Sequence, residues 1–153
     1  MDTKNLDLFD LLVKVGPILG GTFALYQYWR NSKTRHSEWL SSLYEKFYEQ
    51  PHYKKMRWII DYEPKEEIAL IRKHIKNDTK DKTAEELVEL LIDYLNFFEF
   101  IGSLLKLKQI SLIEIKMVFK YYILRIADHD FLMEFIENED FENLDSLIMQ
   151  LNT

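Results

Sequence analysis

The amino-acid sequence predicts an all-α protein, in which one amino-terminal transmembrane helix is followed by a cytoplasmic bundle of about five to six helices. Apolar residues recur at intervals of three and four along most of the chain, and no stretch alternates strictly between apolar and polar residues. Three prolines and four glycines in 153 residues leave little turn chemistry for a sheet. An apolar segment near the amino terminus completes the pattern. We therefore expect a membrane helix in residues 1–30 and a helical domain in residues 31–153.

The composition narrows the class of protein further. The chain is 47% hydrophobic and 30% charged, which is too apolar for a disordered protein and too charged for one with several membrane spans. It contains no cysteine, which excludes disulfides, thiol catalysis and thiolate metal sites. The composition favours a helical domain in a reducing compartment.

Residues 11–29 form the expected membrane anchor. They read LLVKVGPILGGTFALYQYW, nineteen residues with a single charged side chain. As a helix they would extend about 28 Å, close to the thickness of a bilayer core. The segment ends in Tyr26, Tyr28 and Trp29, aromatic residues favoured at the headgroup boundary, and is followed by the basic residues Arg30, Lys33 and Arg35. The excess of positive charge on this side predicts an amino terminus outside and a carboxy terminus in the cytoplasm.

Small residues on one side of this segment predict that the anchor associates with copies of itself. Gly16, Gly20 and Ala24 recur every four residues, and small residues at this spacing let helices approach closely in lipid. Large apolar residues occupy most of the opposite half. The sequence therefore predicts a homo-oligomer whose helix-association face contains these three residues.

Asp10 and Lys14 lie on the same half as the small residues, and an ionisable side chain in a membrane span is costly unless it is paired or hydrated. One interpretation is that Lys14 snorkels to the nearby interface, helped by Asp10 one turn away. A second is that copies of both residues line an oligomeric pore. A third is that the segment is an amphipathic or buried helix of a soluble protein, kinked at Pro17.

The remaining helices are predicted from apolar spacing and from helix-breaking residues. The first helix continues through Glu38 to Tyr48 and is broken by Pro51. Further helices are expected at residues 52–63, 65–76, 84–106 and 111–126, with one broken helix or two short ones at residues 131–151. The expected inward-facing residues are Trp39, Leu40, Leu43, Tyr44, Phe47, Ile68, Ile71, Ile75, Leu132, Phe135, Ile136, Leu144, Leu147 and Ile148.

Two pairs of residues have the spacing of a capping box, in which a hydroxyl and a carboxylate accept hydrogen bonds from free amides at a helix start. Thr83 with Glu86 would begin one helix, and Ser111 with Glu114 would begin the next.

The sequence shows no pattern that indicates catalysis or metal binding. His36, His52, His74 and His129 lie far apart without the spacing of metal ligands. Glycine-rich phosphate loops and nucleophile elbows are also missing from the sequence. We therefore expect a protein that is not an enzyme and uses no cofactor or metal.

Two basic clusters interleaved with aromatic residues are candidates for contacts with a nucleotide or an oligonucleotide, because cations hold phosphates while rings stack on bases. Their cationic members are Lys54, Lys55, Arg57, Lys116, Lys120 and Arg125. The alternative is a solvated basic face that pairs with the acidic carboxy-terminal part, which from Asp128 onward has eight acidic residues and no Lys or Arg. That acidic part is expected to be a solvated face or to meet the basic middle of the same or a neighbouring chain.

Several runs of apolar and aromatic residues give the chain a recognisable character: GGTFALYQYWRN, SEWLSSLYEKFYE, YKKMRWIIDYE and YLNFFEFIGSLLK. With them the chain resembles short bacterial proteins of unknown function that have one amino-terminal membrane helix and a helical cytoplasmic domain. The resemblance implies an inner-membrane location. Within YLNFFEFIG, Asn96 and Glu99 with Gly102 look like a core polar contact and a close helix crossing, and the alternative is that these residues serve packing alone.

The predicted architecture is also similar to that of membrane effectors of bacterial antiphage systems, in which a nucleotide-type signal controls an oligomer that permeabilises the inner membrane. This similarity implies a homo-oligomeric, signal-gated pore or channel whose partners are the lipid bilayer, its own copies and a nucleotide or oligonucleotide signal. The alternative from another class is a non-conducting anchored adaptor that docks a cytoplasmic partner protein.

Overall fold

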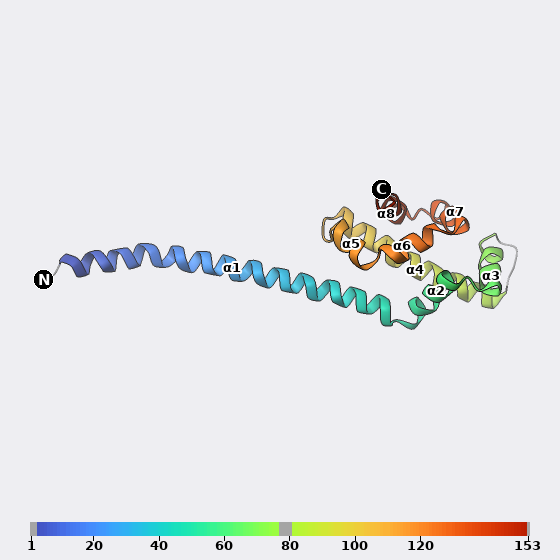
Figure 1. Cartoon of the computed structure of the whole chain (residues 1–153), viewed down its shortest axis with the longest axis horizontal. Helices are drawn as coiled ribbons and strands as arrows, with labels where there is room; N and C mark the ends of the chain where they lie inside the picture. The colour runs from blue at the N-terminus through green and yellow to red at the C-terminus, as the bar shows by residue number, and fades with distance from the viewer. Residues whose placement is uncertain (1–2, 77–80, 153) are drawn as a thin grey trace. The chain divides into compact units, whose positions relative to one another are not determined.

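The computed structural model describes residues 3–76 and 81–152, with side chains from residue 21 onward. These residues form eight α-helices and no strand, which confirms the all-α class. Figure 1 shows the order of the helices along the chain. The helices are α1 (Thr3–Glu49), α2 (Pro51–Tyr62), α3 (Lys65–Ile75), α4 (Lys82–Lys106), α5 (Leu112–Val118), α6 (Lys120–Ala127), α7 (Asp130–Asn138) and α8 (Glu142–Leu151).

Seven described helices follow α1, more than the five to six predicted. The expected helix at residues 111–126 is two helices, because the helical geometry is interrupted at Phe119, where φ is −120° and ψ is −8°. The Phe119 side chain is fully buried. Apolar spacing does not register this break because it continues on both sides.

The chain divides into two compact units, Met1–Glu45 and Lys46–Thr153. The described residues of the first unit, 3–45, all belong to α1, and large hydrophobic side chains are exposed along the part with described side chains. The exposed fraction is 62% for Phe23, 69% for Leu25 and Tyr28, 54% for Tyr26 and 56% for Trp29. Within the described residues, no helix is long and apolar enough to cross a bilayer. Residues 11–20 of the expected anchor lie outside the described side chains.

The predicted inner face of α1 is partly wrong. Phe47, which belongs to the second unit, is fully buried, whereas Trp39 is 36% exposed. The first unit contains a single helix, so it has no second element of its own to cover the Trp39 ring. The predicted end of the helix is confirmed, because α1 stops two residues before Pro51.

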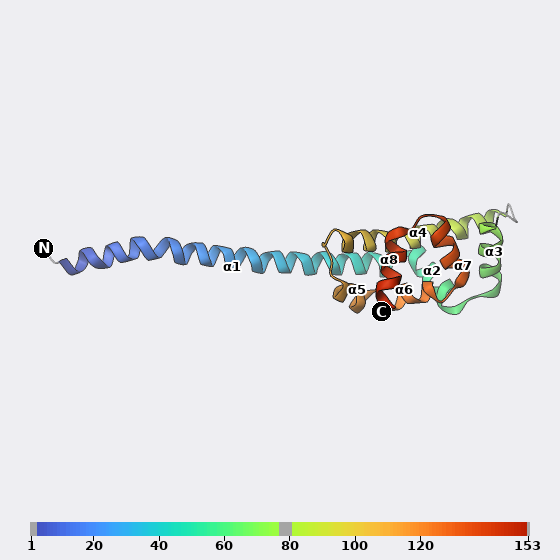
Figure 2. The same ribbon diagram turned by 90° about the horizontal axis from the view of Figure 1, so that it is seen from above.

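Helix α4 is the centre of the second unit and packs against α2, α3 and α8 (Figure 2). Its sequence is apolar at nearly every core-facing position, and eleven of its residues are buried. Helices α6, α7 and α8 contact one another, and α6 also contacts α2. The six predicted inward residues of the last two helices are all buried, as is Ile71, while Ile68 and Ile75 are half-buried.

Aromatic rings fill the core around Phe47. Its ring stacks on Phe97 with the centroids 4.8 Å apart, and the rings of Phe98 and Phe119 meet it edge-on at 5.3 and 5.6 Å. Offset and edge-on pairs are the favoured arrangements of aromatic side chains. The last turn of α1 is thereby fixed to α4 and to the break between α5 and α6.

The two helix starts predicted from capping boxes have different outcomes. Ser111 and Glu114 form a complete capping box at α5. The box predicted at Thr83 and Glu86 is wrong, because Asp81 caps α4 and its carboxylate accepts a hydrogen bond of 2.7 Å from the Thr83 amide. An aspartate at the cap position satisfies the same free amides, and the helix begins at Lys82.

The predicted polar contact and close helix crossing are present where α4 meets α8. The Glu99 carboxylate accepts hydrogen bonds from the amides of Asn143, at 3.2 Å, and Leu144, at 2.8 Å, and a further short one from the Asn143 side chain. A Cβ added at Gly102 would lie 2.5 Å from the Asn143 carbonyl oxygen. Only glycine allows this approach. Asn96 is exposed and takes no part in it.

Candidate interaction surface

One side of α2 is exposed and combines two rings with two cations. Lys54, Trp58 and Tyr62 follow one another at four-residue intervals, and Lys55 lies beside them at a spacing of three from Trp58. Trp58 is 48% exposed and Tyr62 is 74% exposed, and their ring centroids are 6.0 Å apart. Opposite this side, Met56, Ile59 and Ile60 are buried.

A second exposed side runs along α5 into α6. Ile113, Met117 and Tyr121 recur every four residues and are 71%, 80% and 57% exposed, respectively. Lys116 and Lys120 lie next to them and are also exposed. The large apolar side chains at these positions do not belong to the core. Ile115, Phe119 and Ile123, on the opposite side, are the buried residues of this stretch. Exposed apolar residues grouped in this way indicate an interaction site.

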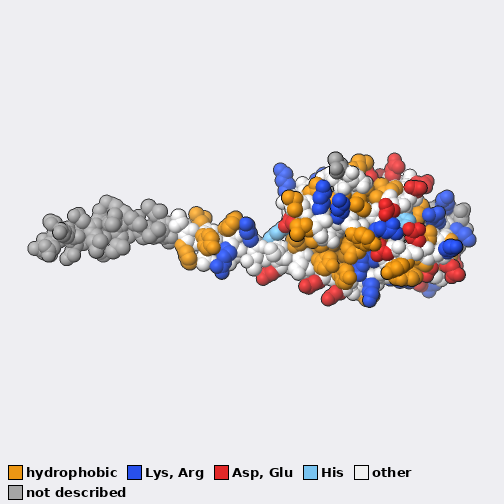
Figure 3. Space-filling model, in the orientation of Figure 1, with side chains coloured by type: hydrophobic (Ala, Val, Ile, Leu, Met, Phe, Trp, Pro, Cys, Tyr) orange, Lys and Arg blue, Asp and Glu red, His pale blue; other side chains and the backbone are white. Residues whose placement is uncertain are grey.

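A direct contact joins the two exposed sides. The Tyr121 hydroxyl donates a hydrogen bond of 3.1 Å to the Asp61 carboxylate of α2. We call the combined region the aromatic–lysine surface, defined by Lys54, Lys55, Trp58, Tyr62, Ile113, Lys116, Met117, Lys120 and Tyr121. Figure 3 shows hydrophobic side chains with Lys and Arg among them over α5 and α6.

The hydrogen bond to Asp61 is the main cause that raises the pKa of Tyr121 above its ordinary value, followed by burial and the negative charge of Asp61. The neutral phenol is therefore the form that the surface favours. Tyr121 can act as a hydrogen-bond donor that is already oriented by α2.

Arg57, predicted among the ligand contacts, lies beneath this surface. Its side chain is 8% exposed, and its guanidinium donates hydrogen bonds to the carbonyl oxygens of Phe47 and, at 2.8 Å, of Tyr48. The guanidinium also lies 4.8 Å from the ring centroids of both residues. These carbonyls are among the last of α1, so Arg57 closes that helix end.

Arg125, also predicted as a ligand contact, joins α6 to the end of α2. Its guanidinium lies 2.9 Å from the Asp128 carboxylate, 3.2 Å from that of Glu63 and 3.7 Å from that of Asp61. It also donates to the Ile60 carbonyl at 2.9 Å. The hydrogen bond with Asp128 is the main cause that raises the pKa of Arg125. Both arginines thus have partners within the domain, and Lys54, Lys55, Lys116 and Lys120 remain as exposed cations.

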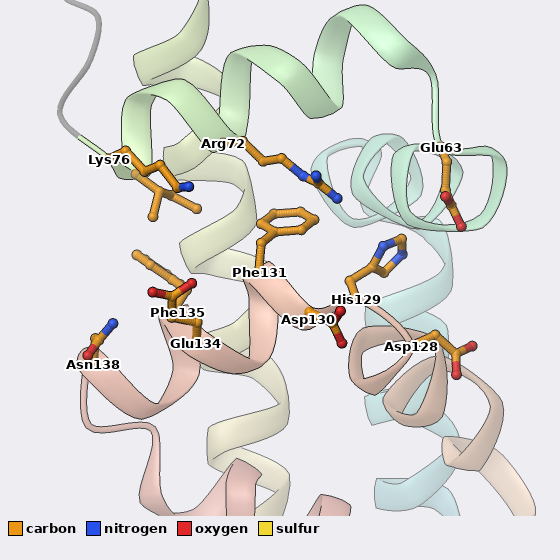
Figure 4. Close-up of a pocket in the computed structure, with 11 residues that line it drawn as sticks. Glu63, Arg72, Lys76, Asp128, His129, Asp130, Phe131, Glu134, Phe135 and Asn138 are labelled. Carbon is orange, nitrogen blue, oxygen red and sulfur yellow. The ribbon is translucent and has the colours of Figure 1, made fainter.

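A separate pocket of about 630 Å³ lies between α3 and α7 (Figure 4). The Arg72 guanidinium lies 4.6 Å from the centroid of the Phe131 ring, and the buried His129 has Nε2 3.2 Å from the Ile60 carbonyl oxygen. Asp130 and Glu134 also line it. Sequence reasoning missed this pocket, because α3 and α7 are far apart in the chain and each has only an ordinary amphipathic pattern.

The pocket has no evident preference for a charged ligand, since Lys76 and Arg72 face several carboxylates. The part of the chain that the structure describes has no group of three or more histidine or acidic side chains placed to hold a metal ion.

The remaining predicted site residues belong to α1. Gly16, Gly20, Asp10 and Lys14 lie outside the residues with described side chains, and Ala24 is exposed. Gly21, which directly follows Gly20 in the sequence, has open space where a Cβ would project.

Comparison of the chain with protein-family models, with curated proteins and with solved structures finds no match. The fold and the surface define an all-α domain, Lys46–Thr153, with an exposed aromatic–lysine surface, preceded by a helical segment with exposed apolar residues.

Proposed function

We propose that the protein is a homo-oligomeric effector anchored in the inner membrane of a bacterium, with a signal-gated pore or channel as its output in antiphage defence. Residues 11–29 insert and associate through Gly16, Gly20 and Ala24, and Asp10 and Lys14 line the pore. The cytoplasmic domain assembles the oligomer or senses a nucleotide-type signal.

The observation that carries this proposal is the run of exposed hydrophobic side chains from Phe23 to Trp29. Exposed apolar residues in such a group mark contact with a membrane or another protein. Tyrosine and tryptophan are favoured at the headgroup level, and cations follow them here. The Lys33 ammonium lies 3.8 Å from the centroid of the Trp29 ring, an arrangement suited to the boundary between lipid and water.

The aromatic–lysine surface is a candidate for either proposed role of the domain, assembly or sensing. Rings that can stack on bases and cations that can contact phosphates occur together there, as in proteins that bind single-stranded nucleic acid. Lys54, Lys55, Lys116 and Lys120 are the exposed cations for such a contact.

Membrane potential in cells tests the effector proposal. Overproduction of the wild-type chain is expected to depolarise cells, because an open pore dissipates the ion gradient. Gly20→Leu, which blocks close helix approach, and Lys14→Leu, which removes the charged lining, are expected to abolish depolarisation. Val15→Leu, on the opposite half of the segment, is the matched control and should retain it. An unchanged potential with the wild-type chain at confirmed membrane levels would refute a pore.

A second candidate function is a non-conducting adaptor, favoured by the large exposed rings of Trp58, Tyr62 and Tyr121. Tryptophan and tyrosine are enriched among the residues that dominate protein–protein binding. Purification in mild detergent distinguishes the two functions. A monomeric anchor that co-purifies with one stoichiometric partner, lost on Trp58→Ala, indicates an adaptor; a defined homo-oligomer without such a partner indicates an effector.

A further inference from the structure

The carboxy-terminal helices present a surface of the opposite charge to the aromatic–lysine surface. Six exposed carboxylates lie on α7, on the turn after it and at the start of α8, and we call them the acidic surface: Asp130, Glu134, Glu137, Glu139, Asp140 and Glu142. Figure 3 shows acidic side chains gathered over α7. No Lys or Arg occurs after Arg125 to neutralise them.

Among the described residues, neither surface forms an ion pair within its own chain, although Arg72 and Lys76 of α3 line the same pocket as Asp130 and Glu134 of the acidic surface. Arg125 uses Asp61, Glu63 and Asp128, which belong to neither surface. Within residues 21–76 and 81–152, the four lysines of the aromatic–lysine surface and the six carboxylates of the acidic surface form no ion pair. The alternative that a basic face pairs with the acidic part of the same chain therefore finds no support at these residues.

We propose that the aromatic–lysine surface of one copy docks on the acidic surface of the next copy. This inference rests on the proposed homo-oligomer and names the contact that assembles it. Charge complementarity carries the assignment of the partner: exposed lysines on α2, α5 and α6 meet exposed carboxylates on α7 and α8, and complementary potentials steer and orient association. The rings of Trp58, Tyr62 and Tyr121 provide the large contact area between the lysines.

The two surfaces consist of different residues, so the contact is heterologous rather than two-fold symmetric. Every copy carries one donor and one acceptor surface, and repetition of such a contact produces a closed ring or an open filament. A ring would supply a fixed number of membrane helices to one assembly, as the proposed pore requires.

Thiol cross-linking between two differently labelled full-length chains tests the contact, and the absence of native cysteines makes the labels unique. One chain carries Met117→Cys and the other carries Glu137→Cys, at exposed positions on the two surfaces. After mixing in detergent, a bifunctional maleimide is expected to produce the mixed dimer well above either self-linked dimer. Raised salt should reduce it, because exposed charges are screened.

Charge reversal makes the test specific. Lys116→Glu with Lys120→Glu on the first chain is expected to lower mixed-dimer formation about tenfold. Glu134→Lys with Glu142→Lys on the second chain should restore it when the two reversed chains are mixed. Lys65→Glu with Lys73→Glu, exposed cations of α3 outside both surfaces, is the matched control and should have no effect.

The outcomes separate this inference from the proposed function. An oligomeric mass in detergent without the mixed cross-link overturns the inference and leaves the effector standing, whereas a monomeric mass without the cross-link overturns both. Cross-linking that is insensitive to both charge reversals overturns the inference as well. So does a lysine reversal that abolishes binding to short RNA or to phosphatidylglycerol vesicles and leaves the cross-link intact.

Discussion

The start of α8 is capped by a residue from a distant part of the chain. Phe141 precedes the helix and offers no side-chain hydrogen bond to the free amides. Glu99, which lies 44 residues before Asn143, accepts hydrogen bonds from the amides of Asn143 and Leu144 instead. A carboxylate at a helix start is stabilised by the helix dipole as well as by these amides. Long-range capping joins local helix stability to tertiary packing.

Replacement of Glu99 by glutamine is expected to destabilise the domain by about 1–2 kcal/mol, because the neutral amide loses charge-assisted hydrogen bonds at this helix start. Urea unfolding followed by circular dichroism measures the effect. Glu89→Gln, an exposed position on the same helix, is the matched control and should be nearly neutral. Equal midpoints for the two variants would show that Glu99 is not a structural cap.

Gly102→Ala is expected to destabilise the domain by about 2 kcal/mol or more, because the new methyl group would meet the Asn143 carbonyl at 2.5 Å and backbone cannot move aside cheaply. The gain in helix propensity of about 1 kcal/mol offsets only part of this cost. Thermal unfolding measures the change. Gly21→Ala, where a Cβ meets nothing within 4 Å, should not lower the transition temperature.

The buried phenol of Tyr94 should make the stability of the domain depend on pH in the alkaline range. Burial, with the ring 1% exposed, raises the pKa of Tyr94 well above its ordinary value. The unfolded chain ionises near pH 10 while the folded chain holds the phenol neutral. The free energy of unfolding should therefore be constant below about pH 10 from this group and fall as pH rises toward the folded pKa. In urea titrations above pH 10, the free energy of unfolding of the Tyr94→Phe variant should fall less steeply with pH than that of the wild-type chain. The same slope for both chains would contradict this account.

At the scale of elements, the sequence predicted those helix ends that residues close in the chain determine. Pro51 and Pro64 bound α2 as expected, and the Ser111–Glu114 capping box fixes the start of α5. The interruption at Phe119 and the preference for Asp81 over Thr83 as a cap were not predicted. Phe119 is buried against Phe47 and Phe97 from other helices, and this tertiary packing leaves no trace in the local spacing.

The candidate surface was predicted in part for the same reason. Exposed lysines and rings followed from helical spacing, but the sequence could not show that Arg57 and Arg125 turn into the domain. Both arginines donate hydrogen bonds to backbone carbonyls of other helices. Every residue has a backbone carbonyl, so the sequence does not indicate which one accepts from an arginine. Only the fold reveals them.

Arg125→Gln is expected to loosen the contact between α2 and α6 and to lower the free energy of unfolding by about 1–3 kcal/mol, since hydrogen bonds to charged groups are lost and the Ile60 carbonyl loses a donor. The side chain is 23% exposed, and solvent screens its ion pairs, which limits the loss of stability. Chemical unfolding at low and high salt measures it. Lys120→Gln, exposed on the same helix, should leave the stability nearly unchanged.

At the scale of the whole molecule, the division after Glu45 separates the roles that we propose for the chain. The second unit has its own aromatic core and includes the last residues of α1. A chain that lacks residues 1–36 should therefore retain a cooperative unfolding transition, because these residues lie within the first unit.

The same shortened chain tests the membrane anchor. It is expected to move from the membrane fraction to the aqueous fraction, since it lacks both the apolar segment and the basic residues after it. Fractionation with and without high-salt washing measures this. Retention of the shortened chain in the membrane at high salt would place the anchor elsewhere in the protein.

The dependence of α8 on Glu99 also has a consequence for synthesis. The ribosome makes α8 after α4, and the start of α8 is capped only when Asn143 and Leu144 reach a glutamate translated earlier. Leu144, Leu147, Ile148 and Leu151 complete the core from the same helix. The contact between α4 and α8 can thus form only after Asn143 and Leu144 have been translated. Chains that stop before Asn143 leave Glu99 and Gly102 of α4 without the helix that they contact.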